Sequence, residues 1–230
     1  MCADRGRLLP MAEASLVLSV RACPAAGARL GGDLYEALRT AAGPRLIIGD
    51  VRGHGTAAAP LAAEVLGAAR SLAVTEADPV RLARALDDRI APVLGAEDFV
   101  TLLVADFRPH EVRLVNCGHP PPLRIARRLE QLFPPQISPP LGLGPDPCLQ
   151  RVCFLPDQRL LLHTDGLTEA RDPDGVFFPL DARARTALRA PTLDQALDDL
   201  LALLHAHTEN ASVADDLTLV LAQPTPVTGA

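Results

Sequence analysis

The sequence predicts an α+β protein built on largely antiparallel sheets. Short apolar runs with the alternation typical of strands come in groups, and longer stretches with helical spacing separate the groups. Grouped strands favour antiparallel pairing, whereas strict strand–helix alternation would favour a parallel sheet. We expect the helices to cover the sheet faces, giving a layered sandwich. One domain is predicted over residues 1–230, with a frayed tail over 224–230.

The first half of the chain predicts three strands and then two helices. Residues 15–22 alternate, with Leu16, Leu18 and Val20 on one face. An apolar stripe at helical spacing and a proline suited to a first helical turn mark the two helices. The expected strands are 15–22, 34–38 and 45–48, and the expected helices are 56–74 and 79–90.

The second half predicts two hairpins, a helix and a closing strand. Residues 99–107 and 112–116 flank a short polar turn and should form one hairpin. The runs 151–155 and 159–163 suggest a second hairpin around Pro156 and Asp157. Thr192 can cap a helix through residue 207, and the closing strand is expected at 217–222.

Composition excludes several classes of function. The net charge is −6 and aromatic residues make up 3% of the chain, which disfavours a generic nucleic-acid partner. The chain contains no lysine, so Schiff-base and P-loop chemistry are excluded. No signal peptide or bilayer-length apolar run is visible, so we expect a cytoplasmic protein with no membrane partner.

Aspartates stand where predicted strands begin or end. Asp33 follows two glycines, Asp50 and Asp165 each end an apolar strand, and Asp215 and Asp216 precede the last strand. Carboxylates that converge from several strand ends are the ligands that Mg²⁺ and Mn²⁺ prefer. Ordinary turn chemistry also places Asp beside Gly, so the pattern alone leaves both explanations open.

Seven motifs in order give a more specific indication. They are GGDLYEA (31–37), IGDVRGHG (48–55), FVTLL (99–103), NCGHPPP (116–122), PPLGLG (139–144), LLLHTDGLTEA (160–170) and DDLTLV (215–220). Together they resemble the SpoIIE-like (RsbU-type) bacterial serine phosphatases, a branch of the metal-dependent type 2C (PPM) protein phosphatases, and the resemblance spans about residue 8 to residue 221.

The resemblance implies an α-β-β-α sandwich that hydrolyses phosphoserine or phosphothreonine on a protein. It implies two Mn²⁺ or Mg²⁺ ions, and a weaker third, that activate a water molecule. The implied catalytic residues are Asp50, which bridges the metals, and Asp165 and Asp215, which hold the second. The remaining implied metal ligands are Asp33, the backbone carbonyl of Val51 and, for the third ion, Glu169.

The sequence departs from the wider family beside the bridging aspartate. Many eukaryotic relatives carry a histidine two residues after it, where this chain has Arg52, and His54 follows. We expect Arg52 to contact substrate, since a guanidinium binds phosphate through two parallel hydrogen bonds, and a plain surface position is the alternative for this residue. His54, two residues further on, is assigned to the same substrate-binding group. Glu36 and Cys117 also replace residues common in the family and leave the acidic set intact.

The resemblance also implies a substrate and a signalling role in the regulation of sigma factors. The usual substrate in this branch is a small phosphorylated anti-anti-sigma (STAS-type) protein, and a regulatory partner or a homodimer is the further partner expected. Two alternatives remain open. One is a catalytically degenerate module that binds a regulatory partner, and the other is a two-metal hydrolase of small phosphoesters.

Overall fold

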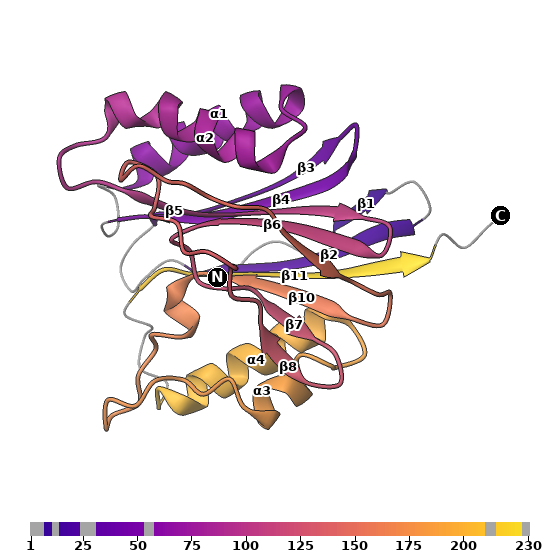
Figure 1. Cartoon of the computed structure of the whole chain (residues 1–230). Helices are drawn as coiled ribbons and strands as arrows, with labels where there is room; N and C mark the ends of the chain where they lie inside the picture. The colour runs from indigo at the N-terminus through magenta and orange to yellow at the C-terminus, as the bar shows by residue number, and fades with distance from the viewer. Residues whose placement is uncertain (1–6, 11–13, 24–30, 53–57, 210–214, 227–230) are drawn as a thin grey trace.

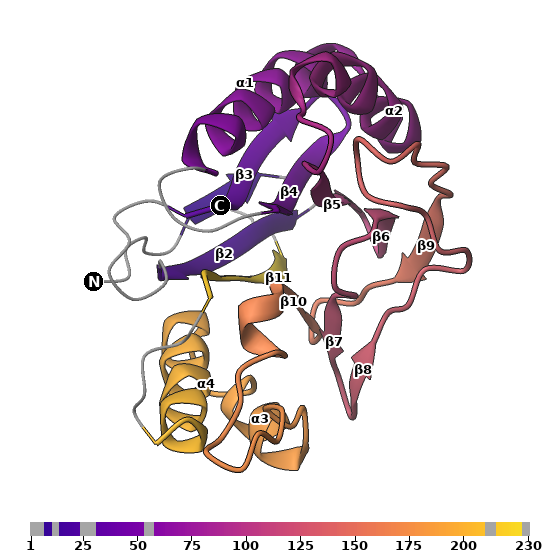
Figure 2. The ribbon, with the colours of Figure 1, turned by 90° about the vertical axis from the view of Figure 1, so that its left-hand side faces the viewer.

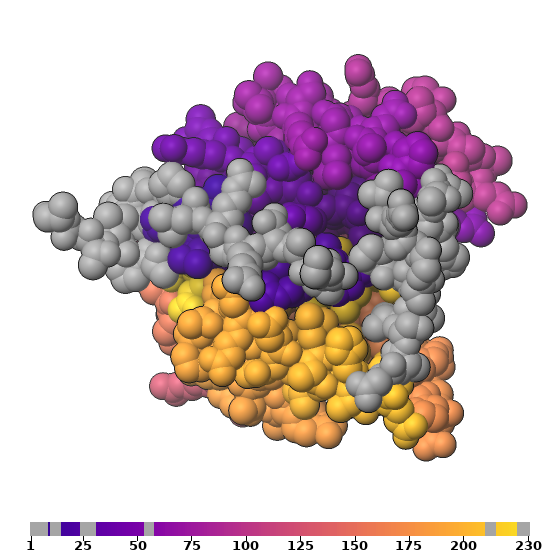
Figure 3. All heavy atoms as spheres, turned by 180° about the vertical axis from the view of Figure 1, so that it is seen from behind, coloured from indigo at the N-terminus to yellow at the C-terminus, as the bar shows by residue number. Residues whose placement is uncertain are grey.

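The computed structural model describes residues 7–10, 14–23, 31–52, 58–209 and 215–226. Two antiparallel sheets are stacked face to face, and a pair of helices covers the outer face of each sheet (Figure 1). This four-layer arrangement confirms the α-β-β-α sandwich expected from the sequence. In Figure 3 the residues of the first helical layer, violet to magenta, lie above the orange residues of the second, with strand residues between them.

The first sheet contains both ends of the described chain. Its long central pair is β2 with β11, which are antiparallel over ten residue pairs. In spatial order its strands are β1 (Arg7–Pro10), β2 (Ala14–Cys23), β11 (Leu217–Pro226), β10 (Arg159–His163), β7 (Leu123–Ile125) and β8 (Leu129–Gln131).

The second sheet is a meander with one later strand added at its edge. Its strands follow chain order; short turns join β3 to β4 and β5 to β6, whereas two helices lie between β4 and β5. They are β3 (Asp33–Thr40), β4 (Gly43–Val51), β5 (Val100–Arg108), β6 (Glu111–Cys117) and β9 (Gln150–Cys153).

The helices are capped by residues that the sequence supplies at their ends. The Asp78 carboxylate accepts backbone hydrogen bonds at the start of α2, and the Thr192 hydroxyl does so at the start of α4. The helices are α1 (Ala59–Thr75), α2 (Pro79–Ile90), α3 (Ala182–Ala187) and α4 (Leu193–His207), with short 3₁₀ turns η2 (Ala91–Val93) and η3 (Asp165–Leu167). Within the described ranges, none of these helices has the length and apolarity to cross a bilayer.

Three apolar cores separate the four layers. Alternation along β4 divides its side chains: Leu46 and Ile48 pack between the sheets, while Ile47 and Val51 pack under α1 and α2. A third core lies between the first sheet and the helices α3 and α4. Because both faces of the central strands are buried, they read as continuous apolar runs in the sequence.

The structure differs from the predicted elements in three respects. The hairpin of 151–155 with 159–163 is wrong, because β9 pairs with β6 in one sheet and β10 pairs with β7 and β11 in the other. The short elements β1, β7, β8 and α3 were not predicted. Residues 224–226, assigned from the sequence to the tail, pair with β2 as the end of β11, and 227–230 lie outside the described residues.

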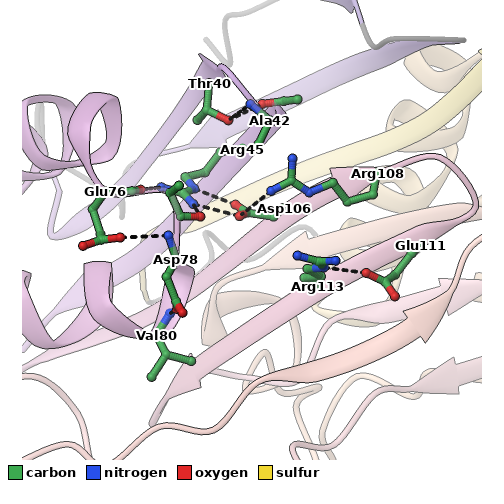
Figure 4. Close-up of polar contacts among 12 residues, drawn as sticks. Thr40, Ala42, Arg45, Glu76, Asp78, Val80, Asp106, Arg108, Glu111 and Arg113 are labelled. Carbon is green, nitrogen blue, oxygen red and sulfur yellow. Dashed lines mark hydrogen bonds and ion pairs between the residues drawn. The ribbon is translucent and has the colours of Figure 1, made fainter.

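A buried ion pair links the second sheet to its helical layer. Arg45 and Asp106 are neighbours on β4 and β5, with side chains 1% and 4% exposed. The guanidinium binds both carboxylate oxygens, at 2.5 and 2.8 Å, and donates to the carbonyls of Glu76 and Ala77 in the α1–α2 connection (Figure 4). Arg45 therefore satisfies a buried charge and two carbonyls at once.

We predict that Arg45→Met destabilises the protein by about 3–5 kcal/mol, because it leaves Asp106 buried without its partner. The free energy of unfolding from chemical denaturation measures the effect. Arg113→Met, which removes a partly exposed pair with Glu111, is the control and should cost less than about 1 kcal/mol. Equal losses in the two variants would contradict the assigned role of Arg45.

Candidate metal centre

Strand alternation brings polar side chains of the second sheet to one end of the space between the sheets. Asp33 begins β3 and lies directly opposite Asp50, near the end of β4. Asp50 in turn lies opposite Thr101 on β5. All three have the parity of residues that pack between the sheets, so their side chains point inward at the end of the sandwich seen in Figure 2.

The first sheet contributes its acidic residues at the same end. Asp165 follows β10 in the turn η3, and Asp215 and Asp216 precede β11. Hydrogen bonds join the sheets here: the Thr164 hydroxyl donates to Asp33 Oδ2 at 2.8 Å, and the backbone N–H of Gly32 donates to Asp216 Oδ2 at 2.7 Å. The structure therefore brings four sequence-predicted aspartates, Asp33, Asp50, Asp165 and Asp215, to one end of the fold.

Gly32 allows the backbone to approach the site closely. A Cβ atom at this position would lie 2.7 Å from the carbonyl oxygen of Val51 and 3.0 Å from Asp50 Oδ1. Only glycine fits without displacing these oxygens. The GGD motif thus keeps the Asp50 carboxylate and the Val51 carbonyl side by side beside the start of β3.

The carboxylates destabilise one another's charged forms. Burial, together with the negative charges of the neighbouring aspartates, raises the pKa of Asp50 from 3.8 to about 8. Burial also raises the pKa of Asp33 to about 7, although hydrogen bonds from Thr218 and Thr164 act in the opposite direction. The pKa of Asp165 is raised by burial first and by Asp215 and Glu169 next.

These residues fit a hard divalent cation. Asp33 Oδ1 is buried and makes no hydrogen bond, so one carboxylate oxygen at the centre of the group lacks a donor. A cation would supply the missing partner and offset the mutual repulsion of the aspartates. Over the described residues, no three acidic, histidine or cysteine side chains lie close enough together to form a complete metal-ligand group.

Three further predicted residues lie outside the acidic group. Glu169 is exposed beside Asp165, whose backbone carbonyl accepts its N–H at 2.8 Å. Arg52 is about half exposed, donates to the Glu97 carbonyl at 2.6 Å and lies over the ring of Phe99. His54 lies outside the described residues, so its contact with substrate stays a prediction.

Sequence reasoning missed the hydroxyl and amide side chains that support the aspartates. Thr101 and Thr218 lie on the inner face of β5 and β11, and Thr164 directly follows β10; the hydroxyl of Thr164 accepts a backbone hydrogen bond from Thr218. Asn116 binds both backbone groups of His119. The sequence signal for the threonines was alternation, because each has the parity of the inward-facing residues of its strand or of the strand just before it.

The fold and the acidic end together define a class of protein. Stacked antiparallel sheets with flanking helices form the fold of the PP2C-type metal-dependent phosphatases, which the chain therefore has. The family described as "Stage II sporulation protein E (SpoIIE)" matches residues 41–225, and the chain belongs to this family. Its membership confirms the resemblance inferred from the seven motifs.

Solved structures show the same fold. The RsbU and RsbW domains of Rv1364c from Mycobacterium tuberculosis are 27% identical, with a TM-score of 0.80 over 96% of this chain and 62% of that one. The PP2C domain and regulatory fragment of SpoIIE from Bacillus subtilis are 15% identical, with a TM-score of 0.75 over 94% of this chain and 65% of that chain. The catalytic domain of the serine/threonine phosphatase PstP, solved with two manganese ions, is 19% identical, with a TM-score of 0.68 over 95% of this chain and 100% of that chain. The chain thus spans less than two thirds of the first two relatives.

We predict that the metal-free protein loses stability as pH rises. The unfolded chain releases the protons of Asp33 and Asp50 near pH 4, while the folded chain retains them until about pH 7 and 8. The unfolded state binds fewer protons in this window, so the free energy of unfolding falls as pH rises. The Tm from circular dichroism should fall between about pH 5 and pH 8, and Mn²⁺ should restore it.

Asp50→Asn should flatten this slope, because it removes the group with the higher raised pKa. Asp157→Asn, at an exposed turn between β9 and β10, is the control and should keep the slope. A metal-free Tm that is constant or rises with pH would contradict the assigned electrostatics.

Proposed function

We propose that this chain is a metal-dependent protein serine/threonine phosphatase. The proposal rests on one observation: Asp33, Asp50, Asp165 and Asp215 lie together at one end of the sandwich. The pKa values of the first three are raised, and the charge of Asp215 contributes to the raised pKa values of Asp50 and Asp165. Such a group favours binding of two Mn²⁺ or Mg²⁺ ions. Membership of the SpoIIE family and the fold of a phosphatase solved with two manganese ions support the same function.

The chain's own residues would hold the ions and orient the phosphate. Asp50, opposite Asp33 on β3, and the Val51 carbonyl lie side by side at the end of β4, and the Asp50 carboxylate would hold both ions. Asp165 and Asp215 approach from the other sheet and Asp33 from β3, with Glu169 near a weaker third ion. The chemistry that such ions supply is acidification of a water molecule and neutralisation of phosphate charge.

Arg52 is placed to recognise the phosphoryl group at the edge of the site. One of its guanidinium nitrogens donates to the Glu97 carbonyl, while the Glu97 carboxylate lies 3.6 Å away and is exposed. The remaining donors of the planar fork suit a phosphate. A groove of about 440 Å³ runs beside Arg52 between the start of α1 and the loop before β5, with Val51, Leu61 and Val93 among its lining residues. An open groove of this kind suits a segment of a protein better than a small phosphoester.

The substrate we propose is a phosphorylated anti-anti-sigma (STAS-type) protein, hydrolysed in the cytoplasm. Support comes from the SpoIIE family and from the relative that carries an RsbU and an RsbW domain. A regulatory partner or a second copy of the chain would then control the activity. Turnover of a phosphoserine STAS protein in preference to an aryl phosphate would separate this substrate from small phosphoesters.

We predict that Asp50→Asn lowers Mn²⁺-dependent hydrolysis of an aryl phosphate at least about 100-fold, since loss of a direct ligand should cost no less than loss of its supporting partners. Steady-state turnover with Mn²⁺, with EDTA and with the variant measures this. Asp157→Asn is the matched control and should keep wild-type turnover.

Turnover that survives both EDTA and Asp50→Asn would contradict the proposed mechanism. Binding of Mn²⁺ that depends on Asp50, without turnover of any phosphoprotein, would favour the alternative of a degenerate module that binds a regulatory partner.

We predict that Arg52→Ala raises KM for a phosphoprotein several-fold, about 1 kcal/mol of lost binding, with a smaller change in kcat. Arg52→Lys should recover only part of the loss, because an ammonium group lacks the planar fork. Arg84→Ala, which removes an exposed arginine paired with Asp146 on the α2 side, is the control. An unchanged KM in Arg52→Ala would remove this residue from the site.

A further inference from the structure

A buried polar chain leads from the crossing between the sheets to Asp50. Residues 118–122 carry the backbone from the end of β6 in one sheet to the start of β7 in the other. His119 lies in this crossing, is 5% exposed and has its Nδ1 2.9 Å from Thr101 Oγ1. The Thr101 hydroxyl accepts the backbone N–H of Asp50 at 3.2 Å and lies 3.4 Å from the Asp50 carbonyl oxygen.

The position of His119 is fixed independently of Thr101. The Asn116 side chain accepts the backbone N–H of His119 at 2.9 Å and donates to its carbonyl at 2.8 Å. Gly118 has φ +68°, and a Cβ there would lie 2.6 Å from the ring of Pro140. The NCGHP sequence therefore builds a rigid support that presents the imidazole to Thr101.

The imidazole is held neutral and uses only one of its nitrogens. Burial first, and the neighbouring His163 next, lowers the pKa of His119 to about 3. Its Nε2 is buried and makes no hydrogen bond, so a polar nitrogen is left unsatisfied at a cost in stability. The hydrogen bond of the ring to another side chain is the one between Nδ1 and Thr101 Oγ1, and this contact links the ring to the backbone of Asp50.

We propose that His119 is a positioning residue of the acidic site: through the Thr101 hydroxyl, its Nδ1 fixes the backbone of Asp50. This inference rests on the proposed function. The hydroxyl contacts both the N–H and the carbonyl of Asp50, so it restrains rotation of the backbone that carries the Asp50 carboxylate and leads to the Val51 carbonyl. His119 is two contacts away from Asp50 and touches neither substrate nor metal. Partners that hydrogen-bond a metal ligand directly, as Thr101 does here, affect metal affinity by about 10–100-fold in metalloproteins.

The test measures Mn²⁺ affinity by calorimetry rather than turnover. Thr101→Val keeps the shape of the side chain and removes the hydroxyl, and we expect it to weaken Mn²⁺ binding about 10-fold or more. Thr101→Ser keeps the hydroxyl and should stay within about 3-fold of wild type. Affinity in Thr101→Val equal to wild type would overturn the proposal.

Two variants at position 119 test whether the hydrogen bond of Nδ1 to Thr101 is needed for Mn²⁺ affinity. The amide of asparagine reaches the place of Nδ1, so His119→Asn should keep most of the affinity, whereas His119→Leu, of similar size, should lose as much as Thr101→Val. The double variant Thr101→Val/His119→Leu should bind no more weakly than either single variant, because both remove the same restraint. Equal affinities in His119→Asn and His119→Leu, or additive losses, would overturn the proposal.

A control separates positioning from a general loss of stability. Val112→Ala opens a cavity at the far end of β6, away from the acidic group, and should lower the unfolding midpoint without changing Mn²⁺ affinity. A matching loss of affinity in Val112→Ala would overturn the inference. If the wild-type chain binds Mn²⁺ but hydrolyses no phosphate ester, only the proposed phosphatase function is contradicted. If the wild-type chain does not bind Mn²⁺, both the phosphatase function and the positioning role of His119 are contradicted.

Discussion

Hydrogen bonds between the two sheets at the acidic end hold the candidate site together. Over most of their area the sheets meet through apolar side chains, and apolar packing is non-directional. The bonds from Thr164 to Asp33 and from Gly32 to Asp216 are directional, so they determine which strand ends face each other. Aspartates that are distant in sequence form one group because these few contacts fix the relative position of the sheets.

Much of the fold and the acidic set was predictable from sequence, because both leave local signals. Continuous apolar runs marked β4 and β5, and Pro79 and Thr192 marked the starts of helices where the structure has them. Strand-end aspartates beside glycines marked the site, and the order of seven motifs indicated the family. These signals are local in the chain, so they survive without knowledge of which strands pair.

The missed features depend on pairing between distant segments. Nothing in residues 151–163 shows that β9 and β10 belong to different sheets, since a polar turn between two strands is typical of a hairpin as well. The short strands β7 and β8 are too brief for a periodic signal. The contact of Thr101 with His119 follows from the crossing between the sheets, so only the tertiary structure brings these side chains together.

The clamp of Arg45 has a mechanical consequence for the helical layer. It joins the sheet to the connection after α1, at the opposite end of β4 from Asp50 and roughly 17 Å along the strand. The link consists of two directional hydrogen bonds from the guanidinium to the Glu76 and Ala77 carbonyls, whereas the apolar contacts beneath the helices are non-directional. The helical layer is therefore held to the sheet at the C-terminal end of α1. A change in the tilt of α1 would displace its other end most, at Ala59, where the helix begins beside Arg52.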